Sequence, residues 1–422
     1  MKGHFWTRRR FIETAAGTPA LAFSIPSRAS GQSAAVRKPE PYSPSILPAG
    51  IRSRFVDNVN GLRVHVLESG FGEGTRPCVI LLHGFPELAF SWRKVMPPLA
   101  AAGFHVLAPD LRGYGRTTGW DDRYDTDLRS FGLLNYVRDA LALVFAFGYR
   151  SVAAVVGHDF GSAVSPWCSI ARPDVFRSVV LMSAPFAGVP TLPFNTADAM
   201  DSKKSASGSV ESLDKELAKL TPPRKQYRTY YSTREANADM MHARQGLAAF
   251  LRAYYHMKSA DWKPNKPFPL TSPSATEFAK LPTYYVMELD KNMPETVASA
   301  MPSPSEIAAC HWLPDSDLNV YVSECERTGF QGGLNGYRVR LTAEHNAELQ
   351  LFASRTIDVP SMFIGGKSDW GVYQTPGAFE HMRAAACTQM KSVHLIGGAG
   401  HWVQQEQPEA VTGLLLDFLR KR

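Results

Sequence analysis

The chain has 422 residues, of which 44% are hydrophobic and 20% are charged, and it contains five cysteines. This apolar fraction is enough for a sizeable core, so the composition excludes a disordered, collagenous or disulfide-stapled protein. The formal charge of +7 comes from basic residues scattered along the chain after the first ten positions, so nucleic acid is not an expected partner. The cysteines lack metal-ligand spacing, so no metal site is expected, and the sequence does not decide whether any two form a disulfide.

Residues 1–37 resemble an export signal and linker. The segment TRRRFIE at 7–13 places paired arginines before an apolar residue, and a weakly hydrophobic stretch follows to Ile25. This pattern is typical of a twin-arginine signal, and a disordered basic tail is the alternative. No later run of about 18 apolar residues exists, so we expect no membrane span. The precursor is expected to engage export machinery, and the mature protein is expected to be periplasmic or secreted.

Short apolar segments that alternate with helical patterns predict an α/β protein. The predicted strands span residues 62–67, 78–82, 105–108, 152–156, 179–182, 361–364 and 393–396. Most are apolar on both faces, which is typical of a mostly parallel sheet flanked by helices.

The alternation of strands and helices stops in the middle of the chain. Residues 188–355 are rich in Tyr, Pro and Ser and contain charged helix-like segments such as 239–257, which predicts an inserted, mainly helical cap domain. The core is then expected in two parts, 38–187 and 356–422.

The motif GHDFG at 157–161 directly follows a predicted buried strand. A strand that turns sharply into a helix needs small residues on both sides of the tip, and the turn lifts the tip side chain above the sheet edge. The motif therefore predicts a nucleophile elbow with Asp159 at its tip, although a glycine-flanked Asp can also be an ordinary turn residue.

Two further side chains follow later strands. Asp369 comes just after the strand at 361–364, and His401 follows the strand at 393–396. With Asp159, they occur in the chain order of α/β-hydrolases, each at the carboxyl end of its own strand, and this predicts a catalytic triad. The segment HGFPE at 83–87 follows an earlier strand, so the amides of Phe85 and Phe160 are the expected oxyanion hole.

These motifs together resemble the epoxide hydrolases of the α/β-hydrolase fold. In addition to the elbow and the HGFPE segment, family motifs match APDLRGYGR at 108–116, GGLNGYR at 332–338 and the loop around His401. The resemblance runs from about Arg52 to the end of the chain. It implies two cap tyrosines that hold the epoxide oxygen: Tyr337, and either Tyr227, which we prefer, or Tyr230.

The chain departs from the family pattern at two positions. The family often has Trp after the nucleophile and before the second tyrosine, where this chain has Phe160 and Gly336. These differences predict a widened or reshaped pocket. The residues expected to line the substrate pocket are His83, Pro86, Trp370 and Trp402.

An aspartate nucleophile suits epoxide opening. Its carboxylate can attack a saturated carbon of the epoxide and displace the ring oxygen, which gives an alkyl ester and an alkoxide that two phenols stabilise. A water molecule activated by His401 then cleaves the ester. No metal or organic cofactor is needed. The predicted function is therefore an epoxide hydrolase that acts on a small-molecule epoxide and water. A haloalkane dehalogenase, which usually holds halide with a ring N–H that Phe160 lacks, and a non-catalytic ligand-binding protein are the alternatives.

Overall fold

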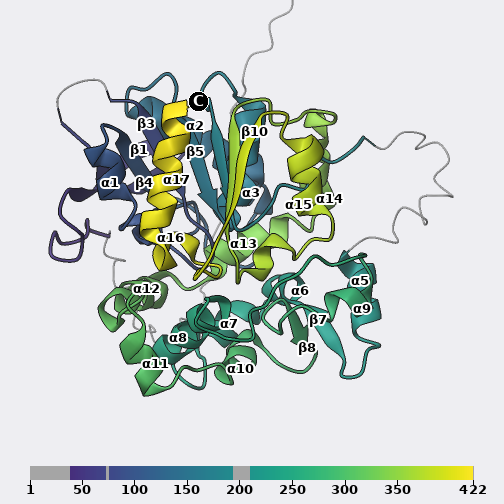
Figure 1. Ribbon diagram of the computed structural model, residues 1–422. Helices are drawn as coiled ribbons and strands as arrows, with labels where there is room; N and C mark the ends of the chain where they lie inside the picture. Colours follow the sequence, from purple (N-terminus) through teal and green to yellow (C-terminus); the bar gives the residue numbers. More distant parts are fainter. Residues whose placement is uncertain (1–38, 73–75, 193–209, 422) are drawn as a thin grey trace, which may run out of the picture. The chain divides into compact units, whose positions relative to one another are not determined.

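Eight strands form one mixed sheet at the centre of the core (Figure 1). The computed structural model describes residues 39–72, 76–192 and 210–421. The sheet order is β1-β2-β4-β3-β5-β6-β9-β10, with antiparallel pairing of β1 with β2 and of β2 with β4, and parallel pairing elsewhere. The strands are β1 Ile51–Val59, β2 Leu62–Ser69, β3 Cys78–Leu82, β4 His105–Pro109, β5 Ala154–His158, β6 Val179–Met182, β9 Ser361–Gly366 and β10 Met390–Ile396.

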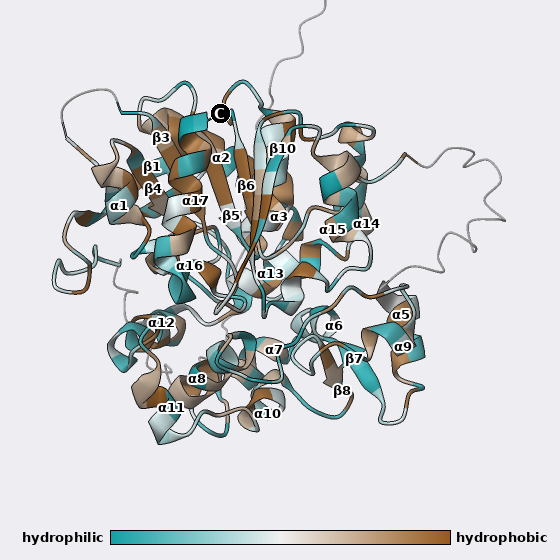
Figure 2. Cartoon of the chain, in the orientation of Figure 1, coloured by the Kyte–Doolittle hydropathy of each residue, from teal (hydrophilic) through white to brown (hydrophobic). Residues whose placement is uncertain are grey.

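Helices cover both faces of this sheet, which explains why its central strands are buried along their whole length. Every residue of β3, β5 and β6 is buried, and Figure 2 shows hydrophobic residues concentrated on these strands. Helices α1 and α17 contact each other on one face, and α2 contacts α3 on the other. The core helices are α1 Met96–Ala101, α2 Leu133–Ala146, α3 Phe160–Ala171, α15 Ala378–His381, α16 Val403–Glu406 and α17 Pro408–Lys421.

A mainly helical segment lies between β6 and β9 in the chain. Its helices are α5 Val210–Leu217, α6 Tyr227–Tyr231, α7 Ala236–Met241, α8 Leu247–Lys258, α9 Ala275–Phe278, α10 Met293–Ala298, α11 Pro304–Ala309, α12 Asp315–Thr328, α13 Gln331–Val339 and α14 Ala343–Leu349. A two-stranded antiparallel sheet joins β7 Arg224–Gln226 to β8 Val286–Glu288. This cap and the mostly parallel sheet confirm the fold class expected from the sequence.

Several elements differ from the expectation. The strand expected at 152–156 lies at Ala154–His158 as β5, and the short strands β7 and β8 were not expected. The helix-like stretch 239–257 is divided between α7 and α8, because Gly246 takes a positive φ of 84° at the start of α8. Strand β1 was not predicted, since its alternation is interrupted by a register shift between Val56 and Val59. Pairing with β2 stabilises it at the sheet edge.

The expected export signal at residues 1–37 lies outside the described residues. Within the part of the chain that the structure describes, no helix combines the length and apolar character needed to cross a membrane. The five cysteines all lie in that part, and each carries a free thiol.

Candidate active site

Asp159 occupies a strained turn between β5 and α3. Its φ of 51° and ψ of −109° lie in a region that non-glycine residues rarely adopt. A Cβ on Gly157 would lie 2.1 Å from the Gly161 carbonyl oxygen, and a Cβ on Gly161 would lie 2.2 Å from the Leu82 carbonyl oxygen. Both glycines are therefore required by close backbone approach, and together they hold the Asp159 side chain above the sheet edge.

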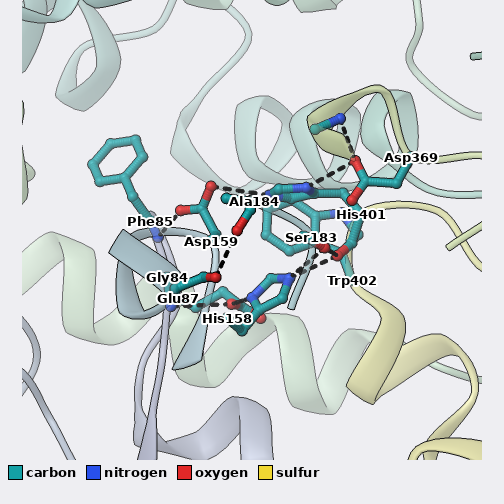
Figure 3. A network of polar contacts seen from close by, with 12 residues as sticks. Gly84, Phe85, Glu87, His158, Asp159, Ser183, Ala184, Asp369, His401 and Trp402 are labelled. Atoms are coloured by element: carbon teal, nitrogen blue, oxygen red, sulfur yellow. Dashed lines mark hydrogen bonds and ion pairs between the residues drawn. The ribbon is translucent and has the colours of Figure 1, made fainter. Parts of the chain in front are cut away.

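The Asp159 carboxylate contacts two groups of the core (Figure 3). The Phe85 amide donates a hydrogen bond of 2.9 Å to Oδ1, and His401 Nε2 lies 3.3 Å from Oδ2. Burial by itself would raise the pKa of Asp159, but the His401 imidazole more than offsets this and lowers the pKa below its usual value. Asp159 is therefore ionised at neutral pH, as a nucleophile must be.

His401 bridges two carboxylates. Its Nδ1 lies 3.1 Å from Asp369 Oδ1, which also accepts a hydrogen bond of 2.7 Å from the Gly371 amide. Both side chains are 1% exposed. Burial opposes the charge of Asp369, but His401 lowers the pKa of this carboxyl below its usual value. With Nδ1 turned to Asp369, Nε2 faces Asp159 and is available to a water molecule.

A second carboxylate–histidine pair lies beneath this triad, and sequence reasoning missed it. His158 Nδ1 lies 2.6 Å from Glu87 Oε2, while His158 Nε2 donates to the His401 carbonyl oxygen at 2.7 Å. The Gln404 and Gln405 amides donate to Glu87 Oε1. Although burial opposes both charges, each partner favours the other, so the pKa of Glu87 is lowered and that of His158 is raised. The sequence does offer a signal for this pair, because Glu87 and His158 are titratable residues next to buried strands.

The cap holds the His401 loop directly. The backbone carbonyl of Lys258, the last residue of α8, accepts a hydrogen bond of 2.9 Å from the His401 amide. The Glu406 carboxylate accepts from the amides of Ala260 in the cap and Trp402 in the core, at 2.8 and 3.0 Å. These bonds tie the position of the histidine to the position of the cap.

A cavity of about 290 Å³ lies above Asp159, and both preferred cap tyrosines line it. The Tyr227 hydroxyl donates to Gln374 Oε1 at 3.1 Å, and the Tyr337 ring centroid lies 6.0 Å from that of Tyr227. Burial and the Asp159 charge raise the pKa of Tyr337, which keeps its hydroxyl protonated. Tyr230 instead donates to Asp239 and does not line this cavity.

The two departures from the family pattern compensate each other. A Cβ on Gly336 would lie 2.8 Å from Cζ of the Phe160 ring, so Phe160 fills the space that a side chain at position 336 would need. The Phe160 ring also packs against Tyr136 and Tyr337. Whether the pocket is wider than in relatives stays a prediction. The Phe160 amide is the first of α3, and no hydrogen bond joins it to Asp159 among the described residues.

The four residues expected to line the pocket do not reach this cavity. His83 is fully buried and accepts a hydrogen bond from the Leu111 amide through Nε2. Pro86 lines a separate cavity of about 20 Å³, and Trp402 packs under His401 at a ring distance of 4.7 Å. Trp370 packs against Phe268. Pro86, Trp370 and Trp402 instead contact cap residues outside the cavity: Tyr255 donates to the Pro86 carbonyl oxygen, Phe268 packs on Trp370, and Trp402 Nε1 donates to the Tyr255 carbonyl oxygen.

Comparison with known proteins gives one consistent result. A family model described as alpha/beta hydrolase fold matches residues 77–408. Epoxide hydrolase A of Mycobacterium tuberculosis is 33% identical over 367 residues, covering 87% of this chain and 96% of that protein. Epoxide hydrolase B of the same organism is 30% identical over 377 residues, with 86% and 96% covered.

Solved structures agree with the sequence relatives. An epoxide hydrolase from an endophytic Streptomyces is similar with a TM-score of 0.68 at 29% identity, covering 88% of this chain and 96% of that one. Potato (Solanum tuberosum) epoxide hydrolase I is similar with a TM-score of 0.64 at 28% identity, covering 88% and 100%.

Proposed function

This chain is an enzyme of the epoxide hydrolase family of the α/β-hydrolase fold, and we propose that it converts an epoxide to a vicinal diol through an alkyl ester on Asp159. The arrangement that carries the proposal is His401 between Asp159 and Asp369, below a cavity that two tyrosine side chains also line. Each part serves one of two chemical steps.

In the first step, an Asp159 carboxylate oxygen attacks one carbon of the epoxide ring. The carbon–oxygen bond of the ring breaks, and negative charge appears on the epoxide oxygen. The hydroxyls of Tyr227 and Tyr337 donate hydrogen bonds to that oxygen and supply the proton that it takes up. Two donors that line the same cavity as the nucleophile support this assignment.

In the second step, His401 Nε2 removes a proton from a water molecule that attacks the ester carbonyl of Asp159. The Phe85 amide, already bonded to Oδ1, receives the oxyanion, and the Phe160 amide at the start of α3 is the second proposed donor. Asp369 stabilises the imidazolium. When the tetrahedral intermediate collapses, the ester carbon–oxygen bond breaks and His401 Nε2 gives its proton to the departing diol oxygen. The proton of the new Asp159 carboxyl passes to the tyrosine that was deprotonated in the first step, so Asp159, His401 and the tyrosine are all regenerated.

A single turnover in heavy-oxygen water tests this route. With enzyme in excess over styrene oxide, the label should enter the Asp159 carboxylate, because water attacks the ester carbonyl and not the epoxide. Peptide mass spectrometry locates the label, and a reaction mixture without substrate is the control. Label found only in the diol would rule out the ester, and halide release from a chloroalkane with no diol from styrene oxide would favour a dehalogenase.

A further inference from the structure

The cavity above Asp159 is lined by an excess of positive charge. Asp159 contributes the sole carboxylate among the described residues that line it, while Arg228 and Arg340 both contribute guanidinium groups. Arg228 belongs to α6, and Arg340 follows α13 directly, so the two charges come from separate elements of the chain. Arg340 remains partly open to solvent at the edge of the cavity. Reduced hydration, and after it the positive charge of Arg228, lower the pKa of Arg340, so the two charges influence each other.

Neither arginine has an anionic partner among the residues that the structure describes. In the described ranges, no carboxylate lies within ion-pair distance of Arg228 or Arg340, whereas Arg252 of the cap pairs with Asp315 at 2.6 Å. Arg228 donates through Nε to the Tyr227 hydroxyl and through Nη2 to Gln374 Oε1, both at 3.2 Å. Its charge is thus held in place by neutral groups and is not neutralised by them.

A buried histidine on the same cavity has no hydrogen-bond partner in the described segments. His345 lies in α14, is 5% exposed, and neither ring nitrogen has a hydrogen-bond partner within the described part of the chain. Burial and the nearby charge of Arg340 lower the pKa of His345 to about 4, so the ring is neutral at neutral pH and presents one N–H donor. A buried polar group without a partner costs stability, which ligand contact would recover.

From these observations, and resting on the function proposed above, we propose that Arg228 and Arg340 bind a carboxylate carried by the substrate, which makes short epoxy acids the substrate class. The planar guanidinium matches a carboxylate with two parallel hydrogen bonds. Arg228 Nε is 3.2 Å from the hydroxyl of Tyr227, which holds the epoxide oxygen in the proposed mechanism. The carboxylate is therefore attached at the epoxide ring or a few bonds from it, and the volume of about 290 Å³ suits a small molecule.

Two other roles for these charges predict a different substrate preference. In the first, Arg340 is a cation that stabilises the carboxyl end of α13. In the second, Arg228 donates to the Tyr227 hydroxyl and so stabilises the negative charge that this tyrosine takes up from the alkoxide. Under those roles a neutral epoxide would react as well as a charged one. A bound carboxylate, in contrast, would be repelled by Asp159 unless the arginines offset that repulsion.

The matched pair of 3-phenylglycidate and 3-phenylglycidamide separates these cases, because the two differ in charge and have nearly the same shape. We expect kcat/KM of the wild-type enzyme to be about tenfold or more higher for the carboxylate than for the amide, because this is the effect of one charge-assisted hydrogen bond. Arg340→Gln should lower the carboxylate-to-amide ratio by about the same factor. Arg177→Gln, which removes an exposed charge outside the cavity, should leave the ratio unchanged.

Inhibition of the wild-type enzyme gives a reading that does not depend on a variant folding. 3-Phenylpropanoate should compete with styrene oxide at lower concentration than 3-phenylpropanamide does. Equal rates for the two epoxides with equal inhibition by the two analogues would overturn the substrate class while leaving epoxide hydrolysis intact. If neither epoxide nor styrene oxide formed an ester on Asp159, the proposed function itself would fail.

Discussion

The core side of the site, where Asp159 lines the cavity and His401 and Asp369 lie behind it, differs from the cap side, where Tyr227, Tyr337 and Arg228 line the cavity. On the core side, each group is fixed by a strand end, a close glycine contact or a neighbouring partner. On the cap side, the Tyr227 hydroxyl donates to Gln374 Oε1 at 3.1 Å and accepts from Arg228 Nε at 3.2 Å, and Arg228 lacks a carboxylate partner within the described part of the chain.

This difference separates two tasks of the enzyme. In the proposed mechanism the covalent chemistry is the same for every epoxide, and its groups are preorganised at the strand ends of the sheet. Recognition of what the epoxide carries is proposed to fall to cap residues that line the cavity. Changes on the core side should therefore affect catalysis or folding for any substrate, and changes on the cap side should affect ring opening and substrate choice.

The largest effect is expected on the core side, for His401→Gln. This variant should still be alkylated at Asp159 but should not release product, so the ester accumulates and steady turnover falls by about 10²–10⁴-fold. The mass of the intact protein after mixing with styrene oxide measures the ester. His311→Gln, at an exposed position, is the control. Unchanged turnover of His401→Gln would contradict the role of this histidine.

A smaller but substantial effect is expected for Glu87→Gln, which removes one partner of the buried pair with His158. Breaking such a pair costs about 3–5 kcal/mol of unfolding free energy. The lowered pKa of Glu87 stabilises the fold above the usual value of 4.5 and this contribution is lost as the pH falls through the lowered value. The raised pKa of His158 stabilises it below 6.5, and this is lost as the pH rises through the raised value.

The stability difference between wild type and Glu87→Gln should therefore be greatest between about pH 4.5 and 6.5 and should shrink toward alkaline pH. Urea unfolding across the pH range measures it. A difference that stays constant from pH 5 to pH 9 would show that the pair is not ionised.

On the cap side, Tyr227→Phe and Tyr337→Phe should each slow alkylation of Asp159 by roughly 100-fold, because one donor to the alkoxide is lost while the other remains. Ester hydrolysis should be spared. The double variant should lose nearly all activity, and its loss need not equal the sum of the single losses, since both hydroxyls serve one charge. Rapid-quench measurement of ester formation follows the first step, and wild-type rates in both single variants would refute the two-phenol mechanism.

The smallest effect is expected for Tyr230→Phe, the matched control for Tyr227→Phe. It removes a hydrogen bond of 3.0 Å to Asp239, away from the cavity, and should cost about 1 kcal/mol of stability with no change in alkylation rate. The same quench experiment and a thermal unfolding curve measure both quantities. If Tyr230→Phe slowed alkylation of Asp159 and Tyr227→Phe did not, Tyr230 would be the first cap tyrosine in place of Tyr227.

The sequence by itself determined the fold class, the approximate places of the sheet strands after residue 61, and the meeting of Asp159, Asp369 and His401. Buried strands and the glycines of the elbow are local signals, and parallel strands bring their carboxyl ends to one edge of the sheet. Any side chain that directly follows such a strand is therefore placed by topology. For this reason three residues far apart in the chain could be grouped before the structure was known.

Only the tertiary structure decided which side chains of the cap face the cavity. Tyr227 and Tyr230 lie in one short helix with similar sequence surroundings, and the packing of that helix turns the first toward Asp159 and the second toward Asp239. The approach of Arg228 and Arg340, and the contact of Phe160 with Gly336, likewise join elements that no local pattern relates. Side-chain direction on a helix depends on what the helix packs against, and that information is not local to the sequence.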